Sequence, residues 1–413
     1  MTSYRIKDVA VINRRSLPEE TDPDYRFRYV DIAAVQGGKL SIPAADLTFA
    51  SAPSRARRLA PPGAVLVSTV RTYLRAIAAV PASSEALVFS TGFAVLEAGD
   101  EIDSRYLAYH CHSQPFIGEV VARSTGVSYP AINASDIGLL PIRLPSLEEQ
   151  RRIADFLDTA TARIDHLAGL LVQQTRLLEE RRLRRIAESV FDVAPSERSR
   201  RLHSVAEVIL GRQRAPQHTT GDHMVPYLRA ANVKDGRLDL SDVMEMNFSP
   251  TEQEVFALRA GDVLVTEGSG SLSAVGASSV WQGEIPGTVC FQNTLLRMRP
   301  RSGLADGAFL EWWARAAFAA REFASIATGA NIFHLSAERV RSLPTRFPPL
   351  RVQQEIAGRL ARETVRIDRF IAMRERQQAL LAERRQALIT AAVTGQFDVS
   401  SASGRNVTEG IAS

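Results

Sequence analysis

The feature that most constrains this chain of 413 residues is a long internal repeat. When the sequence is shifted by 203 residues, Thr125-Gly126 falls on Thr328-Gly329, and the match continues in one register to Glu180-Arg181-Arg182 on Glu383-Arg384-Arg385. Other matched pairs are Leu140-Pro141 with Leu343-Pro344, Gln150 with Gln353, and Arg163-Ile164-Asp165 with Arg366-Ile367-Asp368. One ungapped register of this length does not arise from composition, so the chain contains one unit twice.

A weaker match at an offset of 198 residues precedes the long one, for example Gly63-x-Val65-Leu66-Val67 with Gly261-x-Val263-Leu264-Val265. Each copy therefore has a half that differs between the copies, the variable half, followed by a half that matches closely between them, the well-kept half. The predicted organisation is a variable domain at 1–144, a long helix at 145–193, a linker at 194–201, a second variable domain at 202–347, a second long helix at 348–396 and a disordered tail at 397–413.

The well-kept halves have the apolar pattern of long coiled-coil helices. Ser146 and Glu149 have the spacing of a capping box at the helix start. Apolar residues then recur about every 3.5 residues, and we expect them to pack the two helices antiparallel on each other: Ile153, Leu157, Ile164, Leu167, Leu171 and Leu178 in the first copy, and Ile356, Leu360, Ile367, Phe370, Leu381 and Leu388 in the second. The alternative is that each helix packs only on its own domain.

The variable halves consist of short β-rich runs that are broken by Gly, Pro and Ser. The runs at 64–68, 87–89 and 262–266 predict strands, and the stretches 104–122 and 306–327 predict helices. The predicted fold class is therefore α+β. Two tandem mixed domains with twisted sheets are joined by two long antiparallel coiled-coil helices, in a pseudo-twofold repeat.

Composition excludes several classes of function. Of the 50 basic residues, only Lys7, Lys39 and Lys234 are lysine, an arginine bias that a GC-rich genome would also produce. No Gly-Lys-Ser or Gly-Lys-Thr is present, which rules out a Walker A phosphate loop. The chain has two cysteines and neither a signal-peptide pattern nor an apolar run of membrane-spanning length. We therefore expect a cytoplasmic protein without a membrane span.

Two copies of one motif carry a specific resemblance. They are Leu140-Pro-Ile-Arg-Leu-Pro-Ser-Leu-Glu-Glu-Gln150 and Leu343-Pro-Thr-Arg-Phe-Pro-Pro-Leu-Arg-Val-Gln353, each after a Thr-Gly and each at the start of a long helix. Together with the strand-like segments 66–74 and 261–266, this order resembles the specificity subunit of type I restriction-modification systems over nearly the whole chain. In the second copy Arg351-Val352 replaces Glu148-Glu149, which weakens that capping box.

The resemblance implies a DNA-reading protein without an active site of its own. Each variable half would be a target recognition domain for one half of a split DNA sequence. The conserved helices would set the gap between the half-sites and dock two methyltransferase subunits. In the full complex, restriction subunits would also bind. S-adenosylmethionine, ATP and Mg²⁺ would belong to those partners. The residues agree, because the Pro-Pro pairs at 61–62 and 348–349 lack the preceding Asn or Asp of an adenine methyltransferase motif.

We predict the DNA contacts among polar loop residues next to strands, because side chains at base edges read sequence while arginines also hold phosphates. The first domain contributes Arg71, Tyr73, Arg75, Thr125, Gly126, Ser128 and Tyr129, and the second contributes Glu267, Ser269, Ser271, Thr328, Gly329, Asn331 and His334. Additional phosphate or base contacts are Arg26, Arg28, Lys39, Arg229, Asn232 and Lys234. The alternative for any single residue is a solvated loop side chain.

Other constellations have simpler interpretations. His110-Cys111-His112 would project from different faces of a helix, so no metal site is expected. The charged run 179–185 is interpreted as a coiled-coil flank rather than a DNA contact. Trp312-Trp313 is interpreted as core, with a partner anchor as the alternative.

Two function classes compete with DNA recognition by a subunit. One is a self-sufficient restriction-methylation enzyme, which binding of S-adenosylmethionine to the isolated chain would reveal. The other is a coiled-coil scaffold that binds only protein, which sequence-specific duplex binding by the assembled complex would exclude.

Overall fold

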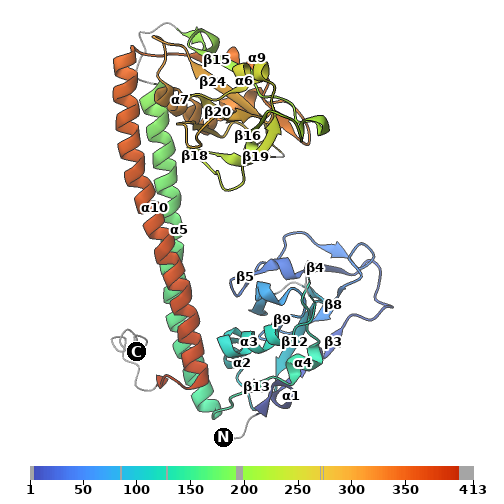
Figure 1. The fold of residues 1–413 in the computed structure, drawn as a ribbon. Helices are drawn as coiled ribbons and strands as arrows, with labels where there is room; N and C mark the ends of the chain where they lie inside the picture. The colour runs from blue at the N-terminus through green and yellow to red at the C-terminus, as the bar shows by residue number, and fades with distance from the viewer. Residues whose placement is uncertain are drawn as a thin grey trace. The chain divides into compact units, whose positions relative to one another are not determined.

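The computed structural model describes residues 4–83, 86–126, 129–191, 199–269, 271–272 and 274–399. Contacts divide the chain into two units, one of residues 1–172 with 376–413 and one of residues 173–375. Each unit contains one variable domain and one segment of each long helix. The two units are described separately (Figure 1).

Two sheets form the variable domain of the first unit. One is antiparallel with the order β10-β9-β12-β2, and the other has the order β3-β8-β11-β4-β7 with β11 parallel to β4. The strands of the first sheet are β2 (Ala10–Ile12), β9 (Val65–Ser68), β10 (Ile77–Ala79) and β12 (Phe93–Ala98). Those of the second are β3 (Arg15–Ser16), β4 (Arg26–Val30), β7 (Leu47–Thr48), β8 (Ala56–Leu59) and β11 (Leu87–Ser90).

Short strand pairs and helices complete this domain. The pairs are β1 (Tyr4–Arg5) with β13 (Pro141–Ile142) and β5 (Val35–Gln36) with β6 (Lys39–Leu40). The helices are α1 (Ile6–Val9), η1 (Ile32–Ala34), η2 (Thr72–Leu74), α2 (Ser104–His112), α3 (Gln114–Ala122) and α4 (Ala134–Gly138). The predicted helix over 104–122 is thus two helices. The break lies at Ser113, which has an extended backbone, because Pro115 in the first turn of α3 has no N–H to continue the hydrogen bonding of α2.

The second domain repeats the antiparallel sheet in the equivalent order β22-β20-β24-β15. Its strands are β15 (Ala206–Leu210), β20 (Val263–Thr266), β22 (Ser278–Val280) and β24 (Leu295–Pro300), and a second sheet contains β16 (Met224–Leu228), β19 (Met244–Asn247) and β23 (Cys290–Phe291). The short pairs are β14 (Arg200–Arg201) with β26 (Pro344–Thr345), β17 (Val233–Lys234) with β18 (Arg237–Leu238), and β21 (Gly268–Ser269) with β25 (Phe333–His334).

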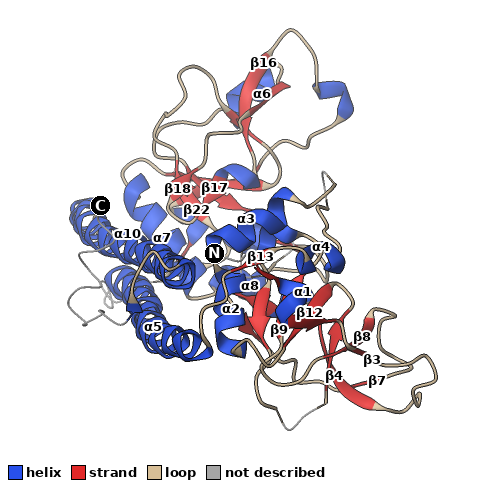
Figure 2. Ribbon diagram, turned by 90° about the horizontal axis from the view of Figure 1, so that it is seen from below, coloured by secondary structure: helices blue, strands red, loops and turns tan. Residues whose placement is uncertain are grey.

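A local sequence difference explains one difference between the domains. The helices of the second domain are η3 (Leu202–Ser204), η4 (Pro216–His218), η5 (Ala230–Asn232), α6 (Pro250–Phe256), α7 (Gly307–Ala319), α8 (Glu322–Ile326) and α9 (Ala337–Arg341). Helix α6 contacts strand β23, whereas strand β8 pairs with β11 in the first domain. Ser249 and Glu252 form a capping box at the start of α6, with Pro250 in its first turn. Helix α7 packs beside β22 (Figure 2) and buries Trp312 and Trp313, as expected from the sequence.

The long helices are α5 (Leu147–Phe191) and α10 (Leu350–Thr394), each of 45 residues. In the first unit the buried Ile153 and Leu157 of α5 share a core with Ile389 of α10. In the second unit Ile186 of α5 shares a core with Leu360 of α10. Within each unit the two segments lie side by side and antiparallel (Figure 1). The predicted fold class, mixed domains with two long paired helices, is confirmed.

An ion pair is repeated with the helices exchanged. In the first unit Arg385 of α10 lies 3.3 Å from Asp165 of α5. In the second unit Arg182 of α5 lies 2.8 Å from Asp368 of α10. Because each residue is separated from its counterpart by the repeat offset of 203, the two units use the same helix packing.

Most of the predicted coiled-coil residues lie along the contact between the helices. Ile153, Leu157, Ile164, Ile356, Leu360 and Leu388 are buried, and Leu171, Leu178, Ile367 and Leu381 are half-buried. The exceptions are Leu167 and Phe370, which are 43% and 38% exposed. Four residues after Ile164 and Ile367, Ala168 and Ile371 are half-buried.

The structure also corrects the linker and the tail. Arg200 and Arg201, placed by the sequence in the linker, form β14 against β26. Phe397, placed in the disordered tail, packs against Phe156 of α5 in a tilted arrangement with ring centroids 5.6 Å apart. Residues 192–198 and 400–413 lie outside the described residues. Among the residues that are described, none of the helices is both apolar enough and long enough to span a membrane.

A buried glutamine explains one repeated residue of the sequence motif. The side-chain amide of Gln353 donates to the carbonyls of Leu304 and Pro348 at 3.0 and 2.7 Å, and its oxygen accepts from the backbone N–H of Asp306 at 2.9 Å. Gln150 makes the equivalent three bonds with Glu101, Pro145 and Asp103. Each glutamine therefore connects the start of a long helix to the start of a domain helix.

We expect Gln353→Leu to destabilise the second domain by about 2–4 kcal/mol, because it leaves three backbone groups without their partner. Thermal unfolding followed by circular dichroism would measure the loss. Gln354→Leu is the matched control, since that neighbouring side chain is exposed. Equal melting temperatures for the two variants would contradict the assigned role of Gln353.

Candidate nucleic-acid interface

Two loops of the first domain are joined into one surface, which we call the first reading edge (residues 69–75 and 125–132, with 127 and 128 not described). Val70 and Thr125 both bridge to Ala131, and the N–H of Ile132 donates to the carbonyl of Thr69 at 2.9 Å. Gly126 has a φ of +107°, and a Cβ there would lie 3.0 Å from the carbonyl oxygen of Tyr129. The Thr-Gly of the repeat therefore permits the tight return of this loop.

The first reading edge presents cationic and aromatic side chains. Arg71, Tyr73, Arg75 and Tyr129 are exposed, and the Arg71 guanidinium lies 5.3 Å from the centroid of the Tyr129 ring. Arg71 and Arg75 have φ values of +50° and +51°, a left-handed conformation that costs a non-glycine residue about 1 kcal/mol or more. Strained residues of this kind gather at functional sites.

The buried hydroxyl of Thr72 anchors the strained turn at residues 71–75. Thr72, between the two arginines, is buried and its Oγ1 lies 2.8 Å from Oγ of Ser124. Thr69 donates its backbone N–H and its hydroxyl to the carbonyl of Gly92 at 2.8 and 2.9 Å. The turn is thus preorganised, so that Arg71, Tyr73 and Arg75 project from a fixed backbone.

The second domain builds an equivalent surface, the second reading edge (residues 267–271 and 328–335, with 270 not described). Strands β21 and β25 pair Gly268 with His334, and the N–H of Leu335 donates to the carbonyl of Glu267 at 2.8 Å. Thr328 bridges to His334, and Gly329 has a φ of +126°. These bonds match those of the first edge residue for residue at the two repeat offsets.

The side chains of the second reading edge differ in chemistry. Nδ1 of His334 lies 3.2 Å from both carboxylate oxygens of Glu267. Ser271 and Asn331 are exposed. For Ser269 only the backbone is described, and Ser128 of the first domain lies outside the described residues. The structure thus brings the strand-end and Thr-Gly predictions together into one surface in each domain.

Sequence reasoning missed two exposed apolar residues at these edges. Leu74 lies in the first edge and Ile332 in the second, and both are more than half exposed. Exposed apolar groups at a DNA surface suit the thymine methyl group. Their position inside a run of predicted contacts was the available signal.

The additional predicted contacts do not gather in the same way. Asn232 is only 2% exposed, and its amide binds the carbonyls of Asp239 and Asp242, so its role is structural rather than DNA contact. Lys39 pairs with Asp165 of α5 at 3.1 Å. Arg28 and Arg229 pair with Asp46 and Asp242. Arg26 and Lys234 are exposed. Four of the six therefore have acceptors within the protein: Asn232, Arg28 and Arg229 in their own domain, and Lys39 on helix α5.

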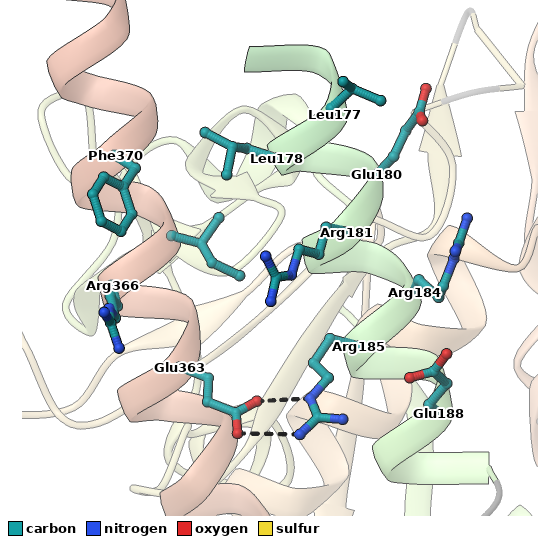
Figure 3. Close-up of a pocket in the computed structure, with 11 residues that line it drawn as sticks. Leu177, Leu178, Glu180, Arg181, Arg184, Arg185, Glu188, Glu363, Arg366 and Phe370 are labelled. Carbon is teal, nitrogen blue, oxygen red and sulfur yellow. Dashed lines mark hydrogen bonds and ion pairs between the residues drawn. The ribbon is translucent and has the colours of Figure 1, made fainter. Parts of the chain in front are cut away.

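A groove of about 920 Å³ runs between α5 and α10 in the second unit. Leu178 and Arg181 of α5 point towards the side of α10 that carries Phe370 (Figure 3), and Leu177 and Ile367 also line the groove. Arg185 donates to both carboxylate oxygens of Glu363, which holds the pKa of that carboxyl below its ordinary value. The combination of an apolar floor and charged rim is typical of protein contact surfaces.

His110 and Cys111 of the His110-Cys111-His112 run are buried in the first domain and have structural roles. His110 is buried with Nε2 3.2 Å from the carbonyl oxygen of Pro141, and burial lowers its pKa to about 4. Burial also raises the pKa of the Cys111 thiol, so it behaves as a small apolar side chain. No group of three or more His, Cys, Asp or Glu side chains that could hold a metal occurs in the described part of the chain.

Part of the chain is similar to known proteins of one family. Residues 1–173 match the type I restriction modification DNA specificity domain. The type I restriction enzyme StySPI specificity subunit of Salmonella potsdam is 25% identical over 274 residues, covering 63% of this chain and 58% of that protein. The EcoKI specificity subunit of Escherichia coli K12 is 24% identical over 281 residues, covering 64% and 60%. The chain therefore matches less than two thirds of the length of these relatives.

Two solved structures share the fold. One, described as the structural basis of complex assembly and conformational transition of the type I R-M system, covers 96% of this chain and 98% of its own at a TM-score of 0.76 and 24% identity. The HsdS subunit from Thermoanaerobacter tengcongensis covers 96% and 97% at a TM-score of 0.50 and 24% identity. Both likenesses extend over nearly the whole chain, which supports the arrangement of two domains and two long helices.

Proposed function

We propose that this chain is the sequence-recognition subunit of a type I restriction-modification complex, because its residues 1–173 match the DNA specificity domain of such systems. Each domain reads one half of a bipartite, asymmetric DNA target. The observation that carries this proposal is the duplicated reading edge, in which one backbone arrangement presents Arg71, Tyr73 and Arg75 in one copy and Glu267 and His334 in the other. A common frame with different side chains suits two half-sites of different sequence.

The chain acts without catalysis of its own. Methylation, DNA cleavage and translocation belong to partner subunits, which bring S-adenosylmethionine and, where a restriction subunit is present, ATP and Mg²⁺. The complex works on chromosomal and invading DNA, and hence in the cytoplasm. The long helices set the gap between half-sites and dock two methyltransferase subunits.

The test is co-expression of the chain with the methyltransferase subunit of its system in a methylation-free host, followed by methylome sequencing. We expect methylated sites that consist of two short defined blocks separated by a gap of undefined bases. A single continuous block, or methylation by the partner without this chain, would overturn the proposal.

Exposed apolar residues on the helices support the docking role. In the first unit Leu167 and Leu170 of α5 and Leu380 of α10 are exposed. In the second unit Leu177 of α5 is exposed together with Phe370 of α10, where the groove of Figure 3 begins. Four of these residues are repeat counterparts, Leu167 with Phe370 and Leu177 with Leu380. Two equivalent apolar patches suit two copies of one partner.

We expect the double variant Leu177→Glu with Phe370→Glu to lose binding of one methyltransferase subunit, because two charges would be buried against an apolar partner surface. Gel filtration of the co-expressed complex with light scattering would show one bound subunit where the wild type binds two. Gln173→Glu, an exposed charge change on α5 outside the groove, is the control. Unchanged stoichiometry in the double variant would contradict docking at this groove.

A further inference from the structure

We infer that the second reading edge recognises an exocyclic amino group of its half-site, the N6 amino group of adenine or the N4 amino group of cytosine. The accepting group is the carboxylate of Glu267, and His334 is its positioning residue. This inference rests on the proposed function and specifies the chemistry of one of its two sites.

The contact between the two side chains defines their hydrogen-bonding roles. Nδ1 of His334 is 3.2 Å from both Oε1 and Oε2 of Glu267. A carboxylate only accepts, so Nδ1 carries the proton and donates. The Glu267 side chain is 15% exposed and that of His334 is 52% exposed, so the pair lies at the surface with the carboxylate set deeper. Gly268 leaves room for the ring, since a Cβ there would lie 3.2 Å from Nδ1.

The fold of the edge does not require this pair. In the first reading edge Thr69 and Ala131 occupy the positions of Glu267 and His334. The backbone bond from Ile132 to Thr69 nevertheless matches the bond from Leu335 to Glu267. The same backbone arrangement therefore forms in the first reading edge without a carboxylate or an imidazole. The Glu267–His334 pair is an addition to the common frame, which points to a role in reading.

Electrostatics then decides what the pair reads. A carboxylate near DNA is repelled by the phosphates, and that cost is offset only where it accepts a hydrogen bond from a base. In the major groove the donors are the amino groups of adenine and cytosine, and Glu is the side chain that accepts from cytosine N4. When His334 is neutral, its Nε2 is a second acceptor. The second edge thus accepts hydrogen bonds, whereas the arginines of the first edge donate them.

The experiment removes the amino group from the DNA and the carboxylate from the protein, separately and together. Duplexes carry the methylated motif of the wild-type complex with single substitutions of purine for adenine or of 2-pyrimidinone for cytosine in the second half-site. Competition binding measures the affinity of the complex of this chain with its methyltransferase subunit. Substitutions at the methylated adenine itself are omitted.

We expect one position at which loss of the amino group weakens wild-type binding about tenfold, the size of one base-edge contact. Glu267→Ala should lose this dependence at that position only, and Glu267→Gln should keep most of it through its amide oxygen. The purine and 2-pyrimidinone arms identify whether the base is adenine or cytosine. An amino-group dependence that persists in Glu267→Ala, or is absent from the wild type at every tested position, overturns the inference.

The role of His334 as a positioning residue is tested by measuring how strongly binding depends on the amino group of the base. His334→Ala should weaken amino-group discrimination, and His334→Asn should restore it, because the Asn amide donates from a place close to that of Nδ1. Glu254→Ala, which removes an exposed carboxylate of α6, should change neither. If His334→Ala keeps full discrimination, the positioning role is wrong. Failure of the wild-type complex to methylate a bipartite site is a separate result, which would overturn the proposed function itself.

Discussion

Replacing Arg71, Tyr73 and Arg75 together with alanine is expected to relax base recognition in one half-site and leave the other unchanged. Each good bidentate contact from arginine to guanine is worth about 1–3 kcal/mol of discrimination between the right and the wrong base. Losing two such contacts would therefore lower the preference for the correct half-site by a factor of roughly 30 or more. The backbone should remain in place, because Thr72 stays anchored to Ser124 and alanine meets the same left-handed strain as arginine.

The measurement is methylation of a randomised-site DNA library by the assembled complex, with assembly checked by gel filtration. The matched variant replaces Glu267, Ser269 and Ser271 with alanine and should relax the other half-site. Binding of the methyltransferase subunit should survive both changes, because none of these residues lies on α5 or α10. If both triple variants loosen the same half-site, the assignment of one reader to each domain is wrong.

Adding one heptad to each long helix is expected to lengthen the gap between half-sites while preserving both half-sites. Seven residues inserted after Val172 in α5 and seven after Glu375 in α10 keep the spacing of the heptads on both helices. Each insertion adds about 10 Å of helix, which corresponds to roughly three base pairs. Inserting a heptad into both helices avoids the mismatch that a change in one alone would create.

Methylome sequencing of the complex with the lengthened chain gives the new gap directly. A control with three residues added to each helix breaks the heptad phase and should lose assembly rather than change the gap. An unchanged gap in a well-assembled heptad variant would show that the helices do not set the distance between half-sites.

The sequence alone predicted the elements that depend on local pattern and on repetition. The offset of 203 residues located both copies, and apolar periodicity located both 45-residue helices to within a few residues. Val65–Ser68 and Val263–Thr266 are strands, as their β-branched composition indicated. These features follow from spacing along the chain, because helix and strand periods are properties of neighbouring residues.

Only the tertiary structure decided how distant polar residues are used. Asn232 and Lys39 resembled free DNA contacts in sequence, but one is buried against loop carbonyls and the other reaches Asp165 on α5. The pairing of Glu267 with His334 joins residues 67 positions apart, and no pattern in the neighbouring sequence predicts this contact. Hydrogen bonds and ion pairs depend on distances of a few ångströms between side chains, and those distances exist only after the chain has folded.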